Sequence, residues 1–392
     1  MRDEMKKVPR LRFRGFQEDW ELCKLGEESD VRDGTHDSPK YFDDGYPLVT
    51  SKNLKDFGLD LSDVSLISYK DFKSINKRSK VDIGDILFGM IGTIGNPVQI
   101  FRDDFAIKNV ALIKEQRKIL NGFLIHILKS PVFDRYIRNE NAGGTQKFLA
   151  LSKVRGFEFL RPNIEEQVRI GNLFKQIDNT ITLHQRKLDK LKELKKAYLQ
   201  VIFPAKDERV PKLRFADFEE EWELRKLEDL ANKYNNLRIP ITASKRIYGN
   251  TPYYGANGIQ DFVEGYTHDG EFILVAEDGA SNLKDYPVQY VNGKVWVNNH
   301  AHVLQAKRSK ADNKFLMNAI KSINIEPFLV GGGRSKLNSE VMMNLEINTP
   351  SKDEQLKIST LCKQLDDITA LYQNKLNQLK NLKKSYLQNM FI

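Results

Sequence analysis

Two segments of this chain, one near its beginning and one near its middle, are almost copies of each other. Residues 8–27 read VPRLRFRGFQEDWELCKLGE and residues 210–229 read VPKLRFADFEEEWELRKLED, with 12 of 20 positions identical. Residues 166–203 align without gaps on residues 354–391, with 20 of 38 positions identical. The sequences between these segments differ. A repeat unit close to half of the 392 residues indicates one unit built twice, and it excludes a solenoid of short repeats.

The second repeated segment predicts a long helix in each copy. Apolar residues recur at steps of three and four and form a stripe along one helix face. Each helix would contain about 35 residues and be roughly 50 Å long at 1.5 Å per residue. A narrow apolar stripe on so long a helix favours a partner helix, and the other copy is the obvious one. The residues expected at this helix–helix interface are Ile177, Ile181, Leu188, Leu191, Leu365, Tyr372, Leu376 and Leu379.

The divergent middles, 28–160 and 230–349, are predicted to be mixed α/β. Short β-rich runs bounded by Gly, Asn and Asp predict strands over 85–92, 271–278, 287–291 and 294–298. Apolar runs predict short helices over 121–133 and 313–323. Because these elements follow the same order in both copies, we expect one fold that carries two different surfaces.

Motifs of an enzyme are missing from the sequence. There is no G-x-x-x-x-G-K-[ST] phosphate loop, no Gly-rich nucleotide fingerprint and no Asn-Pro-Pro-aromatic run. Cys23 and Cys362 are not repeated in the other copy, so neither a disulfide nor a zinc site is expected. His300 and His302 would share one face of a strand, but no third metal ligand is evident. We therefore expect no catalytic residues and no metal site.

Charge and hydropathy point to a binding protein. The 62 Lys and Arg exceed the 53 Asp and Glu, and the net charge of +9 is compatible with a polyanionic partner. Basic residues concentrate in 186–196 and 374–384, either as a solvated helix face or as phosphate contacts. No run approaches 18 apolar residues, and the charged N-terminus lacks a signal-peptide pattern, so we expect no membrane span and a cytoplasmic location.

Polar residues beside glycines in the two middles are the candidates for contacts with nucleic-acid bases. Asn, Gln, Arg and Lys carry donors that reach base edges, and Gly allows close approach of the backbone. For each residue the alternative is an ordinary role in a turn. The candidates are Lys52, Asn53, Thr93, Lys108, Asn109, Thr145, Gln146 and Lys147 in the first middle, and Tyr254, Asn257, Asn298, Asn299, His300, Arg334, Ser335 and Lys336 in the second.

This layout resembles the specificity subunit of type I restriction–modification enzymes. The repeated openings are similar to the conserved start of each target recognition domain, and LKELKKAYLQVIF and LKNLKKSYLQNMF to the ends of the conserved regions. The resemblance implies an α+β fold with two pseudo-symmetric α/β target recognition domains, separated by two long antiparallel helices that form a coiled coil. The expected parts are a first recognition domain over 1–160, a central conserved helix and linker over 161–209, a second recognition domain over 210–349 and a C-terminal conserved helix over 350–392.

The resemblance also implies a function. Each recognition domain would bind one half of a bipartite target in double-stranded DNA, and the helix pair would set the spacer and dock two modification subunits. Up to two restriction subunits would join the complex. The chain itself would be non-catalytic, with no cofactor of its own. The modification subunits would carry S-adenosylmethionine and methylate adenine at N6, and the restriction subunits would use ATP and Mg.

Two other functions remain as alternatives. One is a stand-alone DNA-acting nuclease or methyltransferase, against which the missing cofactor and catalytic motifs count. The other is a coiled-coil scaffold that does not bind DNA. The divergent middles count against a scaffold, because a symmetric scaffold has no reason to vary them.

Overall fold

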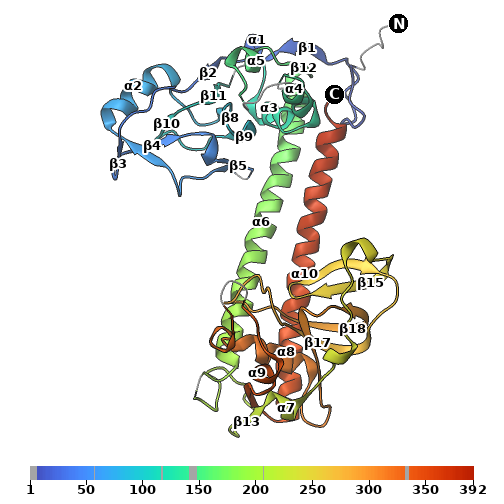
Figure 1. Ribbon diagram of the computed structural model, residues 1–392. Coiled ribbons are helices and arrows are strands. Elements are labelled where there is room, and N and C mark those ends of the chain that lie inside the picture. The colour runs from blue at the N-terminus through green and yellow to red at the C-terminus, as the bar shows by residue number, and fades with distance from the viewer. Residues whose placement is uncertain (1–6, 57, 116–117, 141–147, 206, 332–334) are drawn as a thin grey trace. The chain divides into compact units, whose positions relative to one another are not determined.

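The computed structural model describes residues 7–56, 58–115, 118–140, 148–205, 207–331 and 335–392. The chain divides into two compact units. Unit 1 comprises Met1–Gln185 with Lys375–Ile392, and unit 2 comprises Arg186–Asn374. Each unit therefore combines one divergent middle with parts of both repeated helical segments (Figure 1).

Two long helices, α6 (Ile164–Ile202) and α10 (Lys352–Asn389), confirm the prediction from the repeated apolar stripe. They contain 39 and 38 residues, which is about 57–59 Å at 1.5 Å per residue. Asn163 Oδ1 and Ser351 Oγ each accept a hydrogen bond from the backbone N–H three residues later. These bonds satisfy donors that a helix start leaves unpaired. Among the residues that the structure describes, no helix has the length and apolar content needed to cross a membrane.

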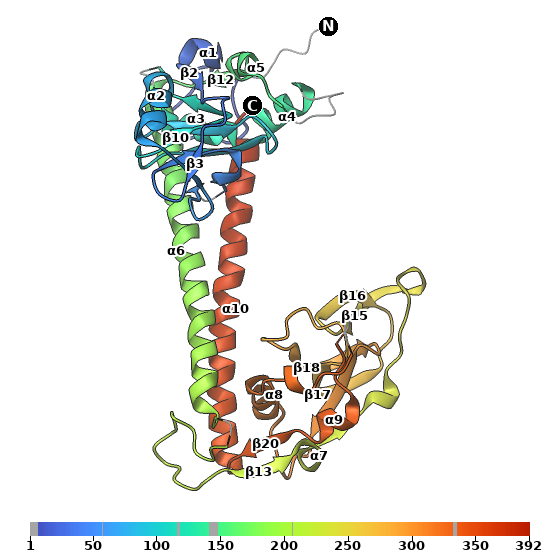
Figure 2. The same cartoon turned by 60° about the vertical axis from the view of Figure 1, so that its left-hand side comes forward.

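Within each unit, the first part of one long helix runs antiparallel to the last part of the other (Figure 2). In unit 1, Asp178 of α6 pairs with Lys383 of α10, with 2.5 Å between Oδ1 and Nζ. In unit 2, Asp366 of α10 pairs with Lys195 of α6. Both aspartates, and both lysines, occupy equivalent positions of the sequence repeat. The same contact therefore forms once in each unit.

The part of unit 1 that precedes α6, which we call the first domain, contains two four-stranded sheets. The order β2-β11-β8-β9 is formed by Val31–Asp33, Val110–Ile113, Ile86–Gly89 and Gly95–Gln99. The order β10-β4-β7-β3 is formed by Ala106–Ile107, Tyr46–Val49, Ser65–Ile67 and Tyr41–Phe42. Two short pairs are β1 (Glu21–Lys24) with β12 (Glu158–Arg161) and β5 (Leu54–Lys55) with β6 (Gly58–Leu59). The helices are α1 (Leu25–Glu28), η1 (Ser51–Asn53), α2 (Tyr69–Ser79), α3 (Asn121–Leu128), α4 (Pro131–Glu140) and α5 (Leu151–Arg155).

Strands β8 and β11 are buried on both faces, which explains their continuous apolar sequences. Phe88 and Ala111 pack in the apolar cluster that includes the residues of α3. Leu87 and Leu112 pack in a second cluster, as expected for side chains that alternate between the faces of a sheet. The helix predicted over 121–133 is two helices in the structure, because Pro131 begins α4.

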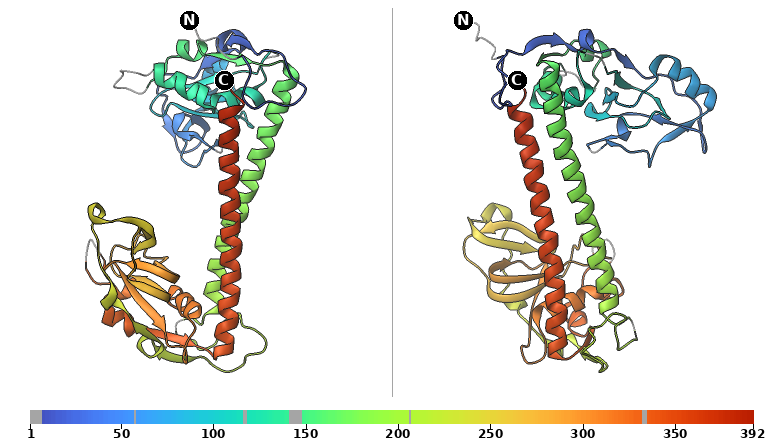
Figure 3. Two further views of the ribbon diagram at one scale, coloured as in Figure 1. Left: turned by 90° about the vertical axis from the view of Figure 1, so that its right-hand side faces the viewer. Right: turned by 180° about the vertical axis from the view of Figure 1, so that it is seen from behind.

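The part of unit 2 between α6 and α10, which we call the second domain, contains one six-stranded sheet in the order β14-β19-β17-β18-β15-β16. Its strands are Ala231–Lys233, Ala301–Ala306, His268–Ala276, Val288–Val297, Tyr248–Gly255 and Gly258–Val263. Strand β13 (Glu223–Lys226) pairs with β20 (Glu346–Thr349). The helices are α7 (Leu227–Leu230), η2 (Asn235–Leu237), η3 (Ala243–Lys245), α8 (Asn313–Ser322), η4 (Glu326–Phe328) and α9 (Ser339–Met343). Helix α8 lies against β17, β18 and β19 (Figure 3).

The predicted strands over 287–291 and 294–298 are a single strand, β18. Gly293, with φ of 91°, continues the ladder opposite Gly270 of β17. A glycine can adopt this positive φ without strain, so the Asn-Gly pair does not end the strand here.

Equivalent ion pairs bind each domain to the start of its long helix. Arg12 donates two hydrogen bonds of 2.8 Å to the fully buried carboxylate of Glu166. Arg214 donates to Glu354 at 2.8 and 2.9 Å in the second copy. The hydrogen bonds to these carboxylates raise the pKa of both guanidinium groups. The repeated openings and the repeated helices are thus two halves of one contact, which explains why both were kept in both copies.

Candidate nucleic-acid interface

In the second domain, segments that are distant in sequence meet at one end of β17. The strand is followed by Glu277 and Asp278, the turn Asn298–His300 joins β18 to β19, and the segment at Lys336 precedes α9. The N–H of Glu277 donates to the carbonyl of His300 (2.9 Å), and the N–H of Leu337 donates to the carbonyl of Glu277 (2.7 Å). We call this region the second-domain polar surface, with the residues Tyr254, Asn257, Glu277, Asp278, Asn298, Asn299, His300, Ser335 and Lys336.

The candidates of the second middle that the structure describes therefore lie near one another, although their roles differ. Asn257 and Asn299 are exposed, and Asn257 Nδ2 donates to the carbonyl of Gly279 (2.9 Å). His300 Nδ1 lies 2.6 Å from Asp278 Oδ1. Asn298 is only 3% exposed, and its Oδ1 accepts from the N–H of His300 (2.8 Å). It therefore shapes the turn from inside.

Two further candidates lie at the edges of this surface. Tyr254 is half-buried in β15, and burial raises the pKa of its hydroxyl. Ser335 is partly exposed next to Lys336, whose side chain is 47% exposed. Arg334 lies outside the described residues.

A carboxylate organises the second-domain polar surface. Glu277 Oε2 accepts a hydrogen bond of 2.6 Å from Arg238 Nη1, and Lys336 Nζ lies 3.0 Å from Glu277 Oε1. Burial alone would raise the pKa of Glu277, but the hydrogen bonds from Arg238 and Lys336 outweigh it and lower the pKa. Glu277 is therefore held as an anion between two cations. Neither Arg238 nor Glu277 was among the predicted residues, because their pairing joins positions 39 residues apart and leaves no local pattern in the sequence.

In the first domain, three candidates lie on exposed or half-exposed loops. Thr93 is exposed between β8 and β9. Lys108 Nζ donates to Ser38 Oγ (2.6 Å). Asn109 has φ of 57°, and its Oδ1 lies 2.8 Å from His36 Nδ1. We call His36, Ser38, Lys52, Thr93, Lys108 and Asn109 the first-domain polar surface. His36 and Ser38 were missed, although the Gly, Thr, Asp and Ser around them are typical of a functional loop.

The neighbouring candidates Lys52 and Asn53 separate into an exposed and a buried residue. Lys52 lies 3.2 Å from Asp63 and its side chain is 52% exposed. Asn53 is 2% exposed, and its amide bonds the N–H of Thr50 and the carbonyls of Asp60 and Asp63. Asn53 is thus a capping residue whose hydrogen-bonding groups are used within the domain. Thr145, Gln146 and Lys147 lie outside the described residues.

The residues predicted for the helix–helix interface lie on the more buried face of each long helix. Leu188 and Leu376, at equivalent positions of the repeat, are each 1% exposed, and Ile177 is 8% exposed. Lys187 Nζ lies 5.8 Å from the ring centre of Tyr372 within unit 2. The others are partly exposed: Ile181, Leu191, Leu365, Tyr372 and Leu379.

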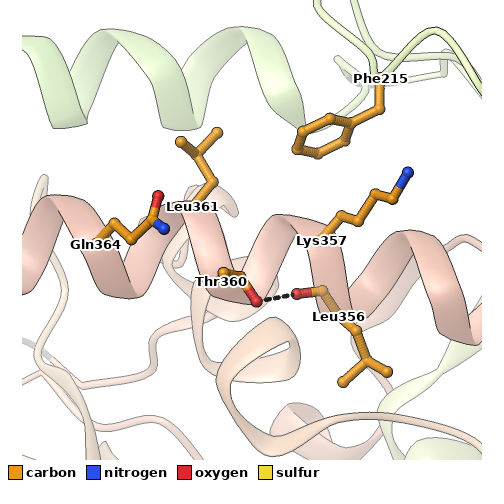
Figure 4. A pocket seen from close by; sticks show the side chains of 6 residues that line it. All are labelled: Phe215, Leu356, Lys357, Thr360, Leu361 and Gln364. Atoms are coloured by element: carbon orange, nitrogen blue, oxygen red, sulfur yellow. Dashed lines mark hydrogen bonds between the residues drawn. The ribbon is translucent and has the colours of Figure 1, made fainter.

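A second kind of surface repeats in both units. Lys357 of α10 lies over the rings of Phe215 and Phe218, and Phe215, Leu356, Lys357 and Leu361 line a shallow hollow with Thr360 and Gln364 (Figure 4). In unit 1, Arg169 lies over the ring of Phe16 at the equivalent positions.

Exposed aliphatic residues recur in the same way. They come in equivalent pairs of like residues, each more than a third exposed: Val8 and Val210, Leu11 and Leu213, Leu22 and Leu224, Val168 and Leu356, Leu183 and Leu371, Leu194 and Leu382. We call these residues the repeated apolar surface. Scattered exposed apolar residues are normal, but their preservation at equivalent positions of both copies calls for a cause.

The chemistry available at the polar surfaces is hydrogen bonding and charge. Among the residues that the structure describes, no group of three or more His, Cys, Asp or Glu could hold a metal ion. His300 pairs with Asp278, and His302 hydrogen-bonds Asn235 and the carbonyl of Leu337, which accounts for the two histidines that the sequence singled out.

A family model described as the type I restriction modification DNA specificity domain matches residues 17–193 and 219–381. The chain belongs to this family. Each matched range covers one of the two divergent middles, 28–160 and 230–349, and the family predicted from the repeated segments is confirmed. The fold class predicted for such specificity proteins is also confirmed, with two α/β domains and two long helices.

The chain is similar to individual members of this family over different fractions of its length. A relative named as a type I restriction enzyme specificity subunit of Haemophilus influenzae is 46% identical over 153 residues, which are 39% of this chain and 38% of that protein. The MjaVIII specificity subunit of Methanocaldococcus jannaschii is 18% identical over 94% of this chain and 91% of its own. The crystal structure of a type I S subunit from M. genitalium shares the fold, with a TM-score of 0.67 over 98% of this chain and 99% of its own, at 15% identity.

Proposed function

We propose that this chain is the DNA specificity subunit of a type I restriction–modification complex and is not itself catalytic. Each recognition domain binds one half of a bipartite target in double-stranded DNA. The observation that carries the proposal is a repeated frame, made of the openings 8–27 and 210–229 and the helical segments 166–203 and 354–391, that holds two different polar surfaces. A frame that repeats its contacts but varies its exposed loops fits a protein that reads two different half-sites.

The residues proposed to contact DNA are those of the two polar surfaces that reach solvent. In the second domain, Lys336 and Asn299 combine exposure with donors that suit phosphates and base edges. Tyr254, Asn257, His300 and Ser335 surround them. In the first domain the proposed residues are Lys52, Thr93, Lys108 and Asn109. Thr145, Gln146, Lys147 and Arg334 remain predicted contacts. Asn53 and Asn298 support their loops from inside.

The repeated apolar surface supports docking of two modification subunits. Other exposed apolar side chains, such as Phe101 (76% exposed) and Tyr248 (84%), lie in the divergent middles, outside the repeated segments. Those of the repeated surface have a counterpart in the other copy, so the same kind of partner can bind once to each unit. In this assembly the modification subunits carry S-adenosylmethionine for adenine-N6 methylation. Up to two restriction subunits, with ATP and Mg, complete it in the cytoplasm.

The test is the map of methylated adenines made by the chain together with its modification subunits. Replacing residues 28–160 by the corresponding segment of another specificity protein should change only one half of the target. The matched control replaces 230–349 and should change only the other half. A change of both half-sites in either chimera, or methylation without a bipartite pattern, would refute the proposal. Methylation or cleavage by the chain alone would favour the alternative of a stand-alone enzyme.

The two long helices are proposed to set the spacer between the half-sites. Each contributes to both units and is longer than the ~34 Å of one DNA turn. Matched insertions of seven residues after Gln185 and before Lys375, where the units divide, lengthen each helix by about 10 Å. The spacer should then grow by about three base pairs at 3.4 Å each, with both half-sites unchanged. An unchanged spacer would contradict this role.

A further inference from the structure

Glu277 stands where the first domain has a buried methionine. The N–H of Leu337 donates to the carbonyl of Glu277 (2.7 Å), and the N–H of Leu149 donates to the carbonyl of Met90 (2.9 Å). Both residues follow a central strand of their sheet. Met90 is 1% exposed and packs in an apolar cluster with Leu149. The two domains therefore hold the same part of the fold in different ways, one by apolar packing and one by charge.

Two cationic side chains and one histidine, from three segments, lie around Glu277. Arg238 follows η2, His302 lies in β19, and Lys336 precedes α9. The Glu277 Oε2 atom lies 2.6 Å from Arg238 Nη1 and 3.4 Å from His302 Nδ1, and Oε1 lies 3.0 Å from Lys336 Nζ. The carboxylate is 14% exposed, so water replaces these contacts poorly.

Arg238 connects Glu277 to the turn Asn298–His300 through hydrogen bonds. Its Nη1 also donates to the carbonyls of Ala301 (2.9 Å) and, more weakly, Asn299 (3.4 Å). Its Nε donates to the carbonyl of Asn235 (3.0 Å). A guanidinium has a fixed fork of donors, so anchoring one side of it by a carboxylate fixes the others. Glu277 thereby fixes the backbone that presents Asn299 and His300.

We propose that Glu277 is a positioning residue for the second half-site: it orients Lys336 and the Asn299–His300 turn toward DNA without contacting DNA itself. This inference rests on the proposed function of the chain. Lys336 is the outer member of the network, with its side chain 47% exposed although it is paired with Glu277. It is therefore held in one direction and still accessible to a phosphate or a base. Met90 gives the first domain no such charged anchor, so the first half-site does not depend on one.

The test uses the full chain with its modification subunits and a DNA library in which both half-sites are varied. Glu277→Gln keeps the shape of the side chain and removes the charge. The preference for the correct second half-site should fall at least tenfold, while the preference at the first half-site stays unchanged. Glu277→Asp, which keeps the charge, should restore part of the preference. Lys336→Met should give the same half-site-confined loss, and the double variant should lose little more than Glu277→Gln alone, because both act through one network.

A matched control separates positioning from stability. Glu354→Gln breaks an Arg–Glu pair in the same unit, at the start of α10, whose carboxylate is more deeply buried than that of Glu277. It should lower thermal stability without changing the ranking of second half-sites. The inference is overturned if Glu277→Gln only lowers stability as Glu354→Gln does, or if it weakens both half-sites equally. If Glu277→Gln does not fold, Lys336→Met decides, and an unchanged second half-site overturns the inference. If the chain without any substitution directs methylation that shows no bipartite pattern, the proposed function itself is refuted.

Discussion

The two buried tryptophans of the repeat, Trp20 and Trp222, offer a measurement in which one copy controls for the other. Both are 2% exposed and pack edge-on against phenylalanines. Trp20 Nε1 donates to Glu166 Oε2 at 3.2 Å. Trp222 Nε1 is buried and has no hydrogen-bond partner among the described residues. The same side chain thus sits in the same place with and without its hydrogen bond.

Replacement of either tryptophan by phenylalanine removes the same volume, so the packing losses should be similar. Trp20→Phe also removes a hydrogen bond to a charged group, which contributes about 1.5–3 kcal/mol. Trp222→Phe instead removes a buried, unsatisfied donor, whose presence costs about 1–3 kcal/mol. We therefore expect Trp20→Phe to be more destabilising than Trp222→Phe by about 2 kcal/mol or more, which is roughly 30-fold in an opening equilibrium.

Native-state hydrogen exchange measures this difference, because it reports the opening of each domain by itself in a chain that need not unfold in one step. Amide protection around β1 and α3 would be followed for Trp20→Phe, and around β13 and α8 for Trp222→Phe. Equal losses of protection in the two variants, or a larger loss for Trp222→Phe, would refute the assignment of the hydrogen bond as the cause.

Phe391→Ala should destabilise unit 1 by about 3–5 kcal/mol, because the ring is 5% exposed and stacks on Phe174; chemical denaturation checks this, and an unchanged midpoint would contradict it. Burial raises the pKa of Cys23 to about 12 and of Cys362 to about 11. Alkylation of both thiols in the native protein should therefore be slow at pH 8 and accelerate about tenfold per pH unit; a rate independent of pH would be inconsistent with buried thiols. Burial lowers the pKa of His302 below 6.5, so its contribution to stability is present above pH 6.5 and is lost as the pH falls through the lowered pKa. Unit 2 should unfold at lower denaturant concentration at pH 5 than at pH 7.5, and the opposite order would refute this.

The parts of the fold that follow from local sequence were predictable. The spacing of apolar residues predicted both long helices and placed Leu188 and Leu376 on their buried faces. Apolar runs located β8 and β17, since a strand buried on both sides needs no alternation with polar residues. The second sheet of the first domain was not predicted, because its strands of two to four residues are too short for a periodic signal.

The polar surfaces were predictable only in outline. Glycines and polar turns located Asn257, Asn299 and Lys336. The same signal also selected Asn53 and Asn298, whose side-chain amides form hydrogen bonds within their own loops. The sequence alone does not show whether an asparagine side chain points into the domain or toward solvent. Glu277 was not predicted, because its role depends on ion pairs with residues that are distant in the sequence.

The duplication explains why the frame and the surfaces could follow different courses. The contact of Asp178 with Lys383 recurs as that of Asp366 with Lys195, as in the self-complementary interface of a two-fold dimer. In a dimer of identical chains every substitution would change both copies, so both recognition surfaces would stay alike. In one duplicated chain, Glu277 can arise where the other copy keeps Met90. The paired contacts of the frame still constrain each other, because a change of Asp178 leaves Lys383 without its carboxylate. Selection for folding therefore preserves the repeated segments, while each half-site surface is free to change alone.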